Sequence, residues 1–358
     1  MPTRSLVTRY EDDLALFPDA WAKAGVALAA IVLAAVPLVA GDYGLTIANN
    51  AMIAVVGAVA MMILTGFCGQ VSLGHAAFLA LGGYTVAILG GSFDVPFWLA
   101  LPAGGLVAAA VGLAIGPFAL RLEGLYLAIV TVGLLFLVQH GLRNGLDMAY
   151  GKDYLAVPMH WTGAEGGASF RDATSLLGVT IRPDQKIYLL FVAITLATVK
   201  IGYNIGHSNI GRAMMAVRDR DLAAASLGVS PARTKLVAFG VSSFLAGIAG
   251  AMYAFAHPIL TLEPFNLKMS VEYVAMVVLG GVGTIFGAVW GALAYTLLSP
   301  LAEQIGALLP FPDGFTSEHQ SVLLFFPVLC AFLIFEPIGL FGVWLRIKRY
   351  FLAWPFRY

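Results

Sequence analysis

Charged residues are scarce in this sequence of 358 residues: Asp, Glu, Lys and Arg make up 11%, whereas hydrophobic residues make up 60%. Soluble domains carry about 25% charged and about 45–50% apolar residues. A soluble fold cannot bury this excess of apolar side chains, because its surface would also be largely hydrophobic. The same composition excludes intrinsic disorder. It predicts a polytopic membrane protein, and the 40 glycines fit membrane helices.

Cysteine is almost absent, with two residues in the chain, Cys68 and Cys330. One pair gives neither a disulfide framework nor the four ligands of a structural zinc site, so we interpret both as small packed hydrophobic residues. The 6 histidines are scattered without metal-ligand spacing. The 20 basic and 20 acidic residues cancel, whereas a nucleic-acid surface requires a basic excess. We therefore expect no metal, no cofactor and no nucleic-acid partner.

Enzyme signatures are also missing. The sequence has no HExxH, CxxC or GxSxG motif. A phosphate-binding GxxxxGKS or GxxxxGKT loop is absent, because the Gly-Lys pair at 151–152 is followed by Asp153. The chain is therefore predicted not to be an enzyme, and if ATP drives it, another chain binds the ATP.

Long apolar runs dominate what is present. A helix needs about 20 apolar residues to cross a bilayer core of about 30 Å. Windows of that size indicate runs at 22–40, 45–64, 73–90, 96–120, 124–141, 186–204, 235–256, 271–299 and 320–341. Acidic residues precede the first run, unlike the basic start of a secretory signal, so we expect this run to be retained. The sequence thus predicts an all-α membrane protein, a helical bundle of about 9–10 transmembrane segments within residues 22–341.

Lys and Arg residues orient the bundle, because they are concentrated in cytoplasmic loops. With the N-terminus in the cytoplasm, fourteen of the 20 fall on the cytoplasmic side and six outside. Segments 1–21, 205–234 and 342–358 are then cytoplasmic, and the loop 142–185 lies outside. The tail 342–358 mixes aromatic and basic residues, which suits an anchor on anionic membrane lipids.

The run 271–299 conflicts with this orientation if it forms one helix, because the residues on both of its sides must lie outside. We therefore expect two short segments, either two spans or a re-entrant pair, broken at Gly280-Gly281-Val282-Gly283. A second glycine-rich break, TGFCGQVSLG, lies at 65–74. Non-helical backbone is tolerated at membrane depth where protein or water surrounds it. Two such breaks are typical of a substrate path, with close helix packing as the alternative.

A polar segment at 209–239, NIGRAMMAVRDRDLAAASLGVSPARTKLVAF, combines dense charge with a small apolar patch at 223–227. Asp221 is placed as a helix-start residue and Gly228 as a helix stop. A short helix between two spans can dock into a groove on a soluble partner through apolar contacts flanked by charges. An ordinary solvated loop is the alternative.

This segment resembles the cytoplasmic coupling loop of ABC-importer permeases of the branched-chain amino-acid type. In that family an Ala-Ala…Leu-Gly helix precedes a Lys-Leu-x-Ala-Phe entry into the next span. The matching residues here are Ala223-Ala224, Leu227-Gly228 and KLVAF at 235–239. The family is also resembled by CGQVSLGHAAFLALGGYTVAIL at 68–89, LAGIAGAMYA at 245–254 and VVLGGVGTIFGAVWGA at 277–292. The likeness extends from about residue 45 to 343 and is strongest to the LivM-type permeases.

The resemblance implies a type II ABC-importer-like permease in a bacterial inner membrane, with a second homologous permease, two ATP-binding subunits and a periplasmic solute-binding protein as partners. It implies that the coupling loop presses on an ATPase, and the residues concerned are Arg218, Asp219, Asp221, Ala223, Ala224, Leu227 and Gly228. It places the translocation path near Gln70, Ser72 and His75, although His75 has a packing or hydrogen-bonding role as its alternative. The glycines that suit such a path are Gly69, Gly74, Gly280, Gly281 and Gly283.

The sequence departs from the family pattern in two places. The wider coupling signature has Glu before its Ala pair, where this chain has Leu222, so apolar docking is expected there in place of a carboxylate contact. The loop after the fifth span is longer and richer in charged and aromatic residues, which leaves the substrate open. The hypothesis is import of branched-chain or related hydrophobic amino acids, with urea, amides or aromatic acids as alternatives.

A stand-alone ion-coupled carrier or channel is the hypothesis from another class. Such carriers use ionisable groups inside the membrane. Between Ala24 and Leu120 the acids are Asp42 and Asp94, both at predicted span ends. The missing acid relay and the predicted docking helix both favour the importer.

Overall fold

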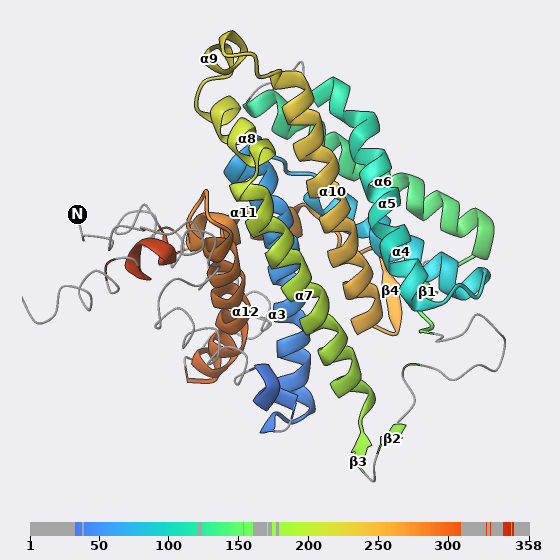
Figure 1. Cartoon of the computed structure of the whole chain (residues 1–358). Coiled ribbons are helices and arrows are strands. Elements are labelled where there is room, and N and C mark those ends of the chain that lie inside the picture. The colour runs from blue at the N-terminus through green and yellow to red at the C-terminus, as the bar shows by residue number, and fades with distance from the viewer. Residues whose placement is uncertain are drawn as a thin grey trace, which may run out of the picture.

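The computed structural model describes residues 33–37, 39–119, 124–152, 154–159, 170, 174–176, 179–308, 327, 330, 339–344 and 346. Its long helices pack side by side as a bundle (Figure 1). The helices are α3 (Asp42–Met61), the π-helix η1 (Met62–Phe67), α4 (His75–Ser92), α5 (Phe97–Ala119), α6 (Leu125–Tyr150), α7 (Pro183–His207), α8 (Asn209–Asp219), α9 (Asp221–Ser226), α10 (Pro231–Ala256), α11 (Leu267–Gly280) and α12 (Ile285–Leu308). The strands are β1 (Tyr154–Ala156), β2 (Thr174–Leu176), β3 (Val179–Ile181) and β4 (Ile259–Thr261).

Among the described residues, the helices that are each long and apolar enough to cross a membrane are Asp42–Phe67, His75–Ser92, Phe97–Pro117, Tyr126–Tyr150, Pro183–His207 and Pro231–Ala256. Each overlaps one predicted run, so the helical polytopic fold is confirmed. α6 continues to Tyr150, beyond the predicted end at 141, and stops where Gly151 adopts a left-handed cap with φ +60°. Outside the described residues lie the segment 1–21, most of the runs 22–40 and 320–341, and most of the tail 342–358.

The run 271–299 is broken at the predicted glycines. α11 and the first part of α12 are bent by 119° around residues 281–284. Gly281 has φ +118° and Gly283 has φ +97°, a backbone region that favours glycine, which explains why the bend falls here. With 14 residues, α11 is about 21 Å long, too short for a core of about 30 Å. α11 alone therefore does not cross the core, whereas α12, with 24 residues, is about 36 Å long and is not the short segment that was expected.

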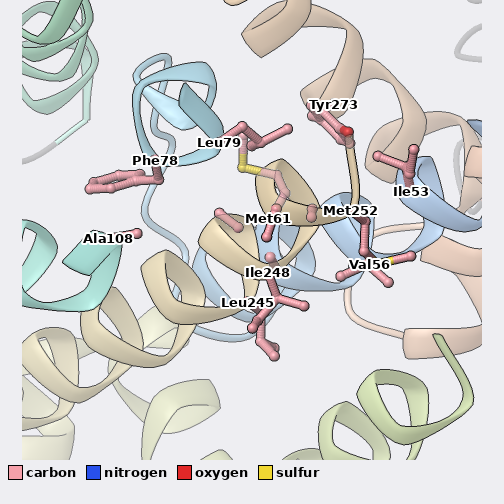
Figure 2. Packing of buried hydrophobic residues seen from close by; sticks show 14 of the residues in the cluster. Ile53, Val56, Met61, Phe78, Leu79, Ala108, Leu245, Ile248, Met252 and Tyr273 are labelled. Atoms are coloured by element: carbon pink, nitrogen blue, oxygen red, sulfur yellow. The ribbon is translucent and has the colours of Figure 1, made fainter. Parts of the chain in front are cut away.

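α10 packs against α3, α4 and α5 in the middle of the bundle (Figure 1). Glycines let the backbones touch: a Cβ on Gly82 would lie 2.0 Å from the carbonyl oxygen of Gly247, and a Cβ on Gly250 1.9 Å from that of Leu79. Small residues serve this purpose in membrane helices, because lipid provides no hydrophobic drive for helices to associate. Large side chains fill the space around these contacts, including Met61, Phe78, Met252 and Tyr273 (Figure 2).

The bundle has two distinct ends (Figure 1). At one, which we call the α8–α9 end, α8 packs against η1. Away from it, at what we call the strand end, β1 pairs antiparallel with β4 and contacts α4, with Leu155 opposite Leu260. η1 lies at the α8–α9 end because α8 packs against it, and the bend after α11 lies there too, because Gly283 is next to Gly66 of η1.

Candidate functional site

The first glycine-rich break begins where α3 changes into a π-helix. η1 covers Met62–Phe67, and the chain then loops to the start of α4. The N–H of Gln70 donates to the carbonyl oxygen of Leu64 at 3.1 Å, and the Thr65 hydroxyl donates to the carbonyl oxygen of Gln70 at 3.1 Å. The loop is therefore folded back onto the end of η1. π-helical turns are rare and occur frequently at functional sites.

The second break lies directly against the first. The N–H of Gly283 is 3.2 Å from the sulfur of Met62, although the two residues are 221 positions apart. A Cβ on Gly66 would lie 3.2 Å from the nitrogen of Gly283. Gly339, from the C-terminal part of the chain, packs against the second break: a Cβ on Gly339 would lie 2.7 Å from the backbone nitrogen of Gly281. The structure thus brings the two breaks together.

Arg218, expected in the coupling loop, also reaches the breaks. Its Nη1 donates to the carbonyl oxygen of Gly66 at 2.7 Å, and its Nη2 is 3.0 Å from the carboxylate of Asp219. A Cβ on Gly69, whose φ is +73°, would lie 2.6 Å from Arg218 Cγ. The residues expected to face an ATPase and those expected along the path are therefore neighbours at this point.

Ser72 and His75, at the start of α4, are buried, with 0% and 1% of their surface exposed. Nε2 of His75 lies 3.1 Å from the carbonyl oxygen of Gly57. Its ring packs edge-on against Tyr273, with the ring centroids 5.0 Å apart. These contacts are internal and match the packing alternative for His75 in this conformation. Contact with a solute stays a prediction for both residues.

Two hydroxyls near the first break were not among the predicted site residues. The N–H of Leu73 donates to Thr131 Oγ1, and the N–H of Ala76 donates to Ser270 Oγ, both at 3.0 Å. The first N–H groups of a helix have no partner within it, so these hydroxyls hold the start of α4 against α6 and α11. The sequence marks both as isolated polar residues inside apolar runs. Gly74 lies at the same junction, where a Cβ would be 2.4 Å from the carbonyl oxygen of Thr131.

A cavity of about 270 Å³ opens beside the first break at the α8–α9 end. Its lining combines the loop, the start of α6, the end of α8, the first residue of α9 and one residue of α10: Cys68, Gly69, Gln70, Gly124, Leu127, Val217, Arg218, Asp219, Arg220, Asp221 and Lys235. The Gln70 side chain is 6% exposed, and within the described part of the chain its Oε1 has no hydrogen-bond partner. The arrangement gives a polar opening next to the meeting point of the two breaks.

The predicted short helix is present as α9. Asp221 begins it and accepts a hydrogen bond from the N–H of Leu222 at 2.8 Å. Leu227 is its C-cap, and Gly228 turns the chain with φ +87°. The apolar patch is divided, because Ala224 is 2% exposed whereas Leu222 and Leu227 are each 84% exposed. Two large apolar side chains therefore extend into solvent from the α8–α9 end.

Within the described ranges, no group of three or more His, Cys, Asp or Glu side chains is placed so that it could hold a metal ion.

Comparison with known proteins gives relatives along most of the chain. The family model "Branched-chain amino acid transport system / permease component" matches residues 43–332. The chain is 31% identical over 320 residues to the high-affinity branched-chain amino acid transport system permease protein LivM of Salmonella typhimurium strain LT2, covering 87% of this chain and 72% of that protein. It is also 31% identical over 326 residues to LivM of Escherichia coli strain K12, covering 87% and 73%.

A more distant relative is the fructose import permease protein FruG of Bifidobacterium longum strain NCC 2705, with 26% identity over 276 residues, 68% of this chain and 77% of that protein. No solved structure shows a significant match. The matched range 43–332 contains the long helices of the described residues, except for Asp42 at the start of the first, together with both breaks and the α8–α9 segment. The chain therefore belongs to the family of permease components of branched-chain amino acid transport systems.

Proposed function

We propose that this chain is a permease subunit of an ATP-driven importer for branched-chain or related hydrophobic amino acids, in which it forms half of the translocation path. The observation that carries the proposal is its 31% identity to two LivM permeases over 87% of its length. The helical bundle with two meeting breaks supports a path through the protein, because interrupted helices at membrane depth offer backbone groups to a solute.

The proposed partners are a second homologous permease, two ATP-binding subunits and a periplasmic solute-binding protein. The exposed leucines of α9 support the ATPase contact, because apolar anchors on a short helix fit a groove on a soluble protein. The sequence also lacks a phosphate-binding loop, which supports ATP binding by another chain.

The proposed orientation puts the α8–α9 end in the cytoplasm and the strand end in the periplasm of a bacterial inner membrane, with both termini cytoplasmic. Basic residues gather at the α8–α9 end, in keeping with the concentration of Lys and Arg in cytoplasmic loops. They include Lys200, Arg212, Arg218, Arg220 and Arg233. The solute-binding protein would then meet the strand end.

The proposed path leaves the membrane beside the two breaks. Gly69 and Gln70 line the cavity there, and Gly280, Gly281 and Gly283 form the facing break. Backbone N–H and carbonyl groups suit an amino acid, because they can bind its carboxylate and ammonium groups without a fixed charge. Ser72, Gly74 and His75 are proposed to continue the path at the start of α4, next to this opening.

A transport assay tests which solute this protein carries. We would purify the tagged chain from its native membrane in mild detergent, identify co-purifying proteins by mass spectrometry, and reconstitute the complex in liposomes. ATP-dependent uptake of radiolabelled leucine is expected, with a non-hydrolysable ATP analogue as the control. Fructose belongs among the competitors, because one relative is named for fructose import. Recovery of the chain alone, with uptake driven by an ion gradient, would overturn the proposal in favour of a carrier.

A further inference from the structure

Arg218 lies between α9 and the two glycine-rich breaks. Its Nη1 donates to the carbonyl oxygen of Gly66, in the last turn of η1, at 2.7 Å. A Cβ on Gly69 would lie 2.6 Å from its Cγ, and a Cβ on Gly283 would lie 3.4 Å from its Nη1. Glycines from both breaks therefore form the surface on which this side chain rests.

Charge strengthens this contact. Nε and Nη2 of Arg218 are both 3.0 Å from Oδ1 of Asp219, and the arginine side chain is 32% exposed. The last carbonyl oxygens of a helix lack partners within it, and a cation at that end is favourable. Hydrogen bonds from a charged donor are about twice as strong as neutral ones. The guanidinium thus completes the end of η1 while Asp219 orients it.

We propose that Arg218 is the positioning residue through which α8 and α9 control the two breaks, so that a shift of α8 moves both breaks together. The inference rests on the proposed function, because it takes an ATPase as the source of the shift. It goes further by naming the side chain that carries the movement from the surface to the path.

The two breaks lie so close together that one side chain, that of Arg218, lies against both of them. Gly66, Gly69 and Gly283 have no side chains of their own, so the Arg218 side chain can approach the backbone of both breaks closely. The planar guanidinium bonds Gly66 with one nitrogen and Asp219 with two others. Lysine carries a single compact ammonium on a flexible stem and does not reproduce this fork.

The main test uses the purified transporter with its co-purified partners in liposomes, and measures solute imported per ATP hydrolysed. Arg218→Gln should lower this ratio about tenfold or more while hydrolysis continues, the factor expected when a hydrogen bond from a charged group is lost. Arg218→Lys should be intermediate. Arg212→Gln is the matched control on α8, because the Arg212 guanidinium bonds locally to the carbonyl oxygen of His207 and the side chain of Asn209. It should equal the wild type.

A second readout follows the break itself. Val282 is 51% exposed between Gly281 and Gly283, so a Val282→Cys variant can be labelled with a maleimide once the exposed native Cys330 is replaced by serine. With Arg218 present, the labelling rate should differ between ATP-bound and nucleotide-free transporter. With Arg218→Gln the difference should vanish. A purely structural role would lower yield or thermal stability but leave the difference in place.

The outcomes separate this inference from the proposed function. Wild-type transporter without ATP-driven uptake refutes the importer and this inference with it. Normal wild-type uptake, combined with an unchanged ratio and nucleotide-dependent labelling in Arg218→Gln, overturns the inference alone. If Arg218→Gln fails to assemble, Asp219→Asn decides, because Asp219 is 67% exposed and its loss leaves the Gly66 bond available. If the Asp219→Asn transporter imports about two- to fivefold less solute per ATP hydrolysed than the wild type, the inference is supported; if this ratio is unchanged, the inference is refuted.

Discussion

Replacing Leu222 and Leu227 together by alanine should weaken binding of the ATPase subunit and leave the permease folded. Both residues are 84% exposed, so their side chains contribute little to packing within this chain. The anchor of α9 is Ala224 at 2% exposure, which the double variant retains. The substitution therefore removes apolar surface that is offered to a partner.

The size of the effect follows from that exposure. Full burial of a leucine side chain is worth about 1.5–3 kcal/mol relative to leaving it in water. Because both leucines are largely exposed, most of this free energy can still be gained when the ATPase buries them. Alanine retains part of the apolar surface, so we expect each substitution to weaken binding of the ATPase by about 1–2 kcal/mol. Together the two changes give about 2–4 kcal/mol, which corresponds to a Kd about 30- to 1,000-fold higher.

The assay is a titration of the purified ATPase subunit onto the permease in lipid nanodiscs. Leu196→Ala is the matched control, because this leucine is 55% exposed but lies within the span of α7. The control should leave the Kd unchanged. A double variant that binds the ATPase within about twofold of the wild type, at unchanged thermal stability, would refute docking through α9.

Two further predictions test the fold. Gly57→Ala should lower the free energy of unfolding by about 1–3 kcal/mol, because its Cβ would lie 2.3 Å from a ring carbon of Tyr273. In the same thermal-unfolding assay Gly133→Ala, which has nothing within 4 Å of its Cβ, should not be destabilised. Cysteines at Leu155 and Leu260 should form a disulfide on oxidation, because the two residues are opposite each other in the β1–β4 pair. Failure to cross-link, seen as no mobility shift on a non-reducing gel, would contradict the register.

Local patterns were sufficient to predict much of this architecture. The length of an apolar run reports a span directly, and the described long helices follow the predicted runs. The break at Gly281 and Gly283 was predictable because glycine tolerates the positive φ that the bend needs. Asp221 and Gly228 likewise marked the two sides of α9.

Contacts between distant segments were not predictable in this way. Arg218 was expected to face an ATPase, and periodicity gives no indication that its guanidinium meets Gly66, 152 positions earlier. Ala224 and Leu227 formed one patch in the sequence, but Leu227 is the C-cap of α9, where the chain leaves helical geometry. Burial of Ala224 depends on the elements packed beneath the helix, which its neighbours in sequence do not specify.

The β1–β4 pair also sets an order of events in folding. Leu155 is synthesised well before Leu260, and both α7 and α10 lie between them in the chain. β1 therefore remains an unpaired strand edge until both intervening helices have been inserted, since pairing requires β4 to reach the same side. An unpaired edge is a site for wrong associations, so its short length of three residues limits that risk. Closure of this small ladder would mark the moment at which the central helices have reached their final places.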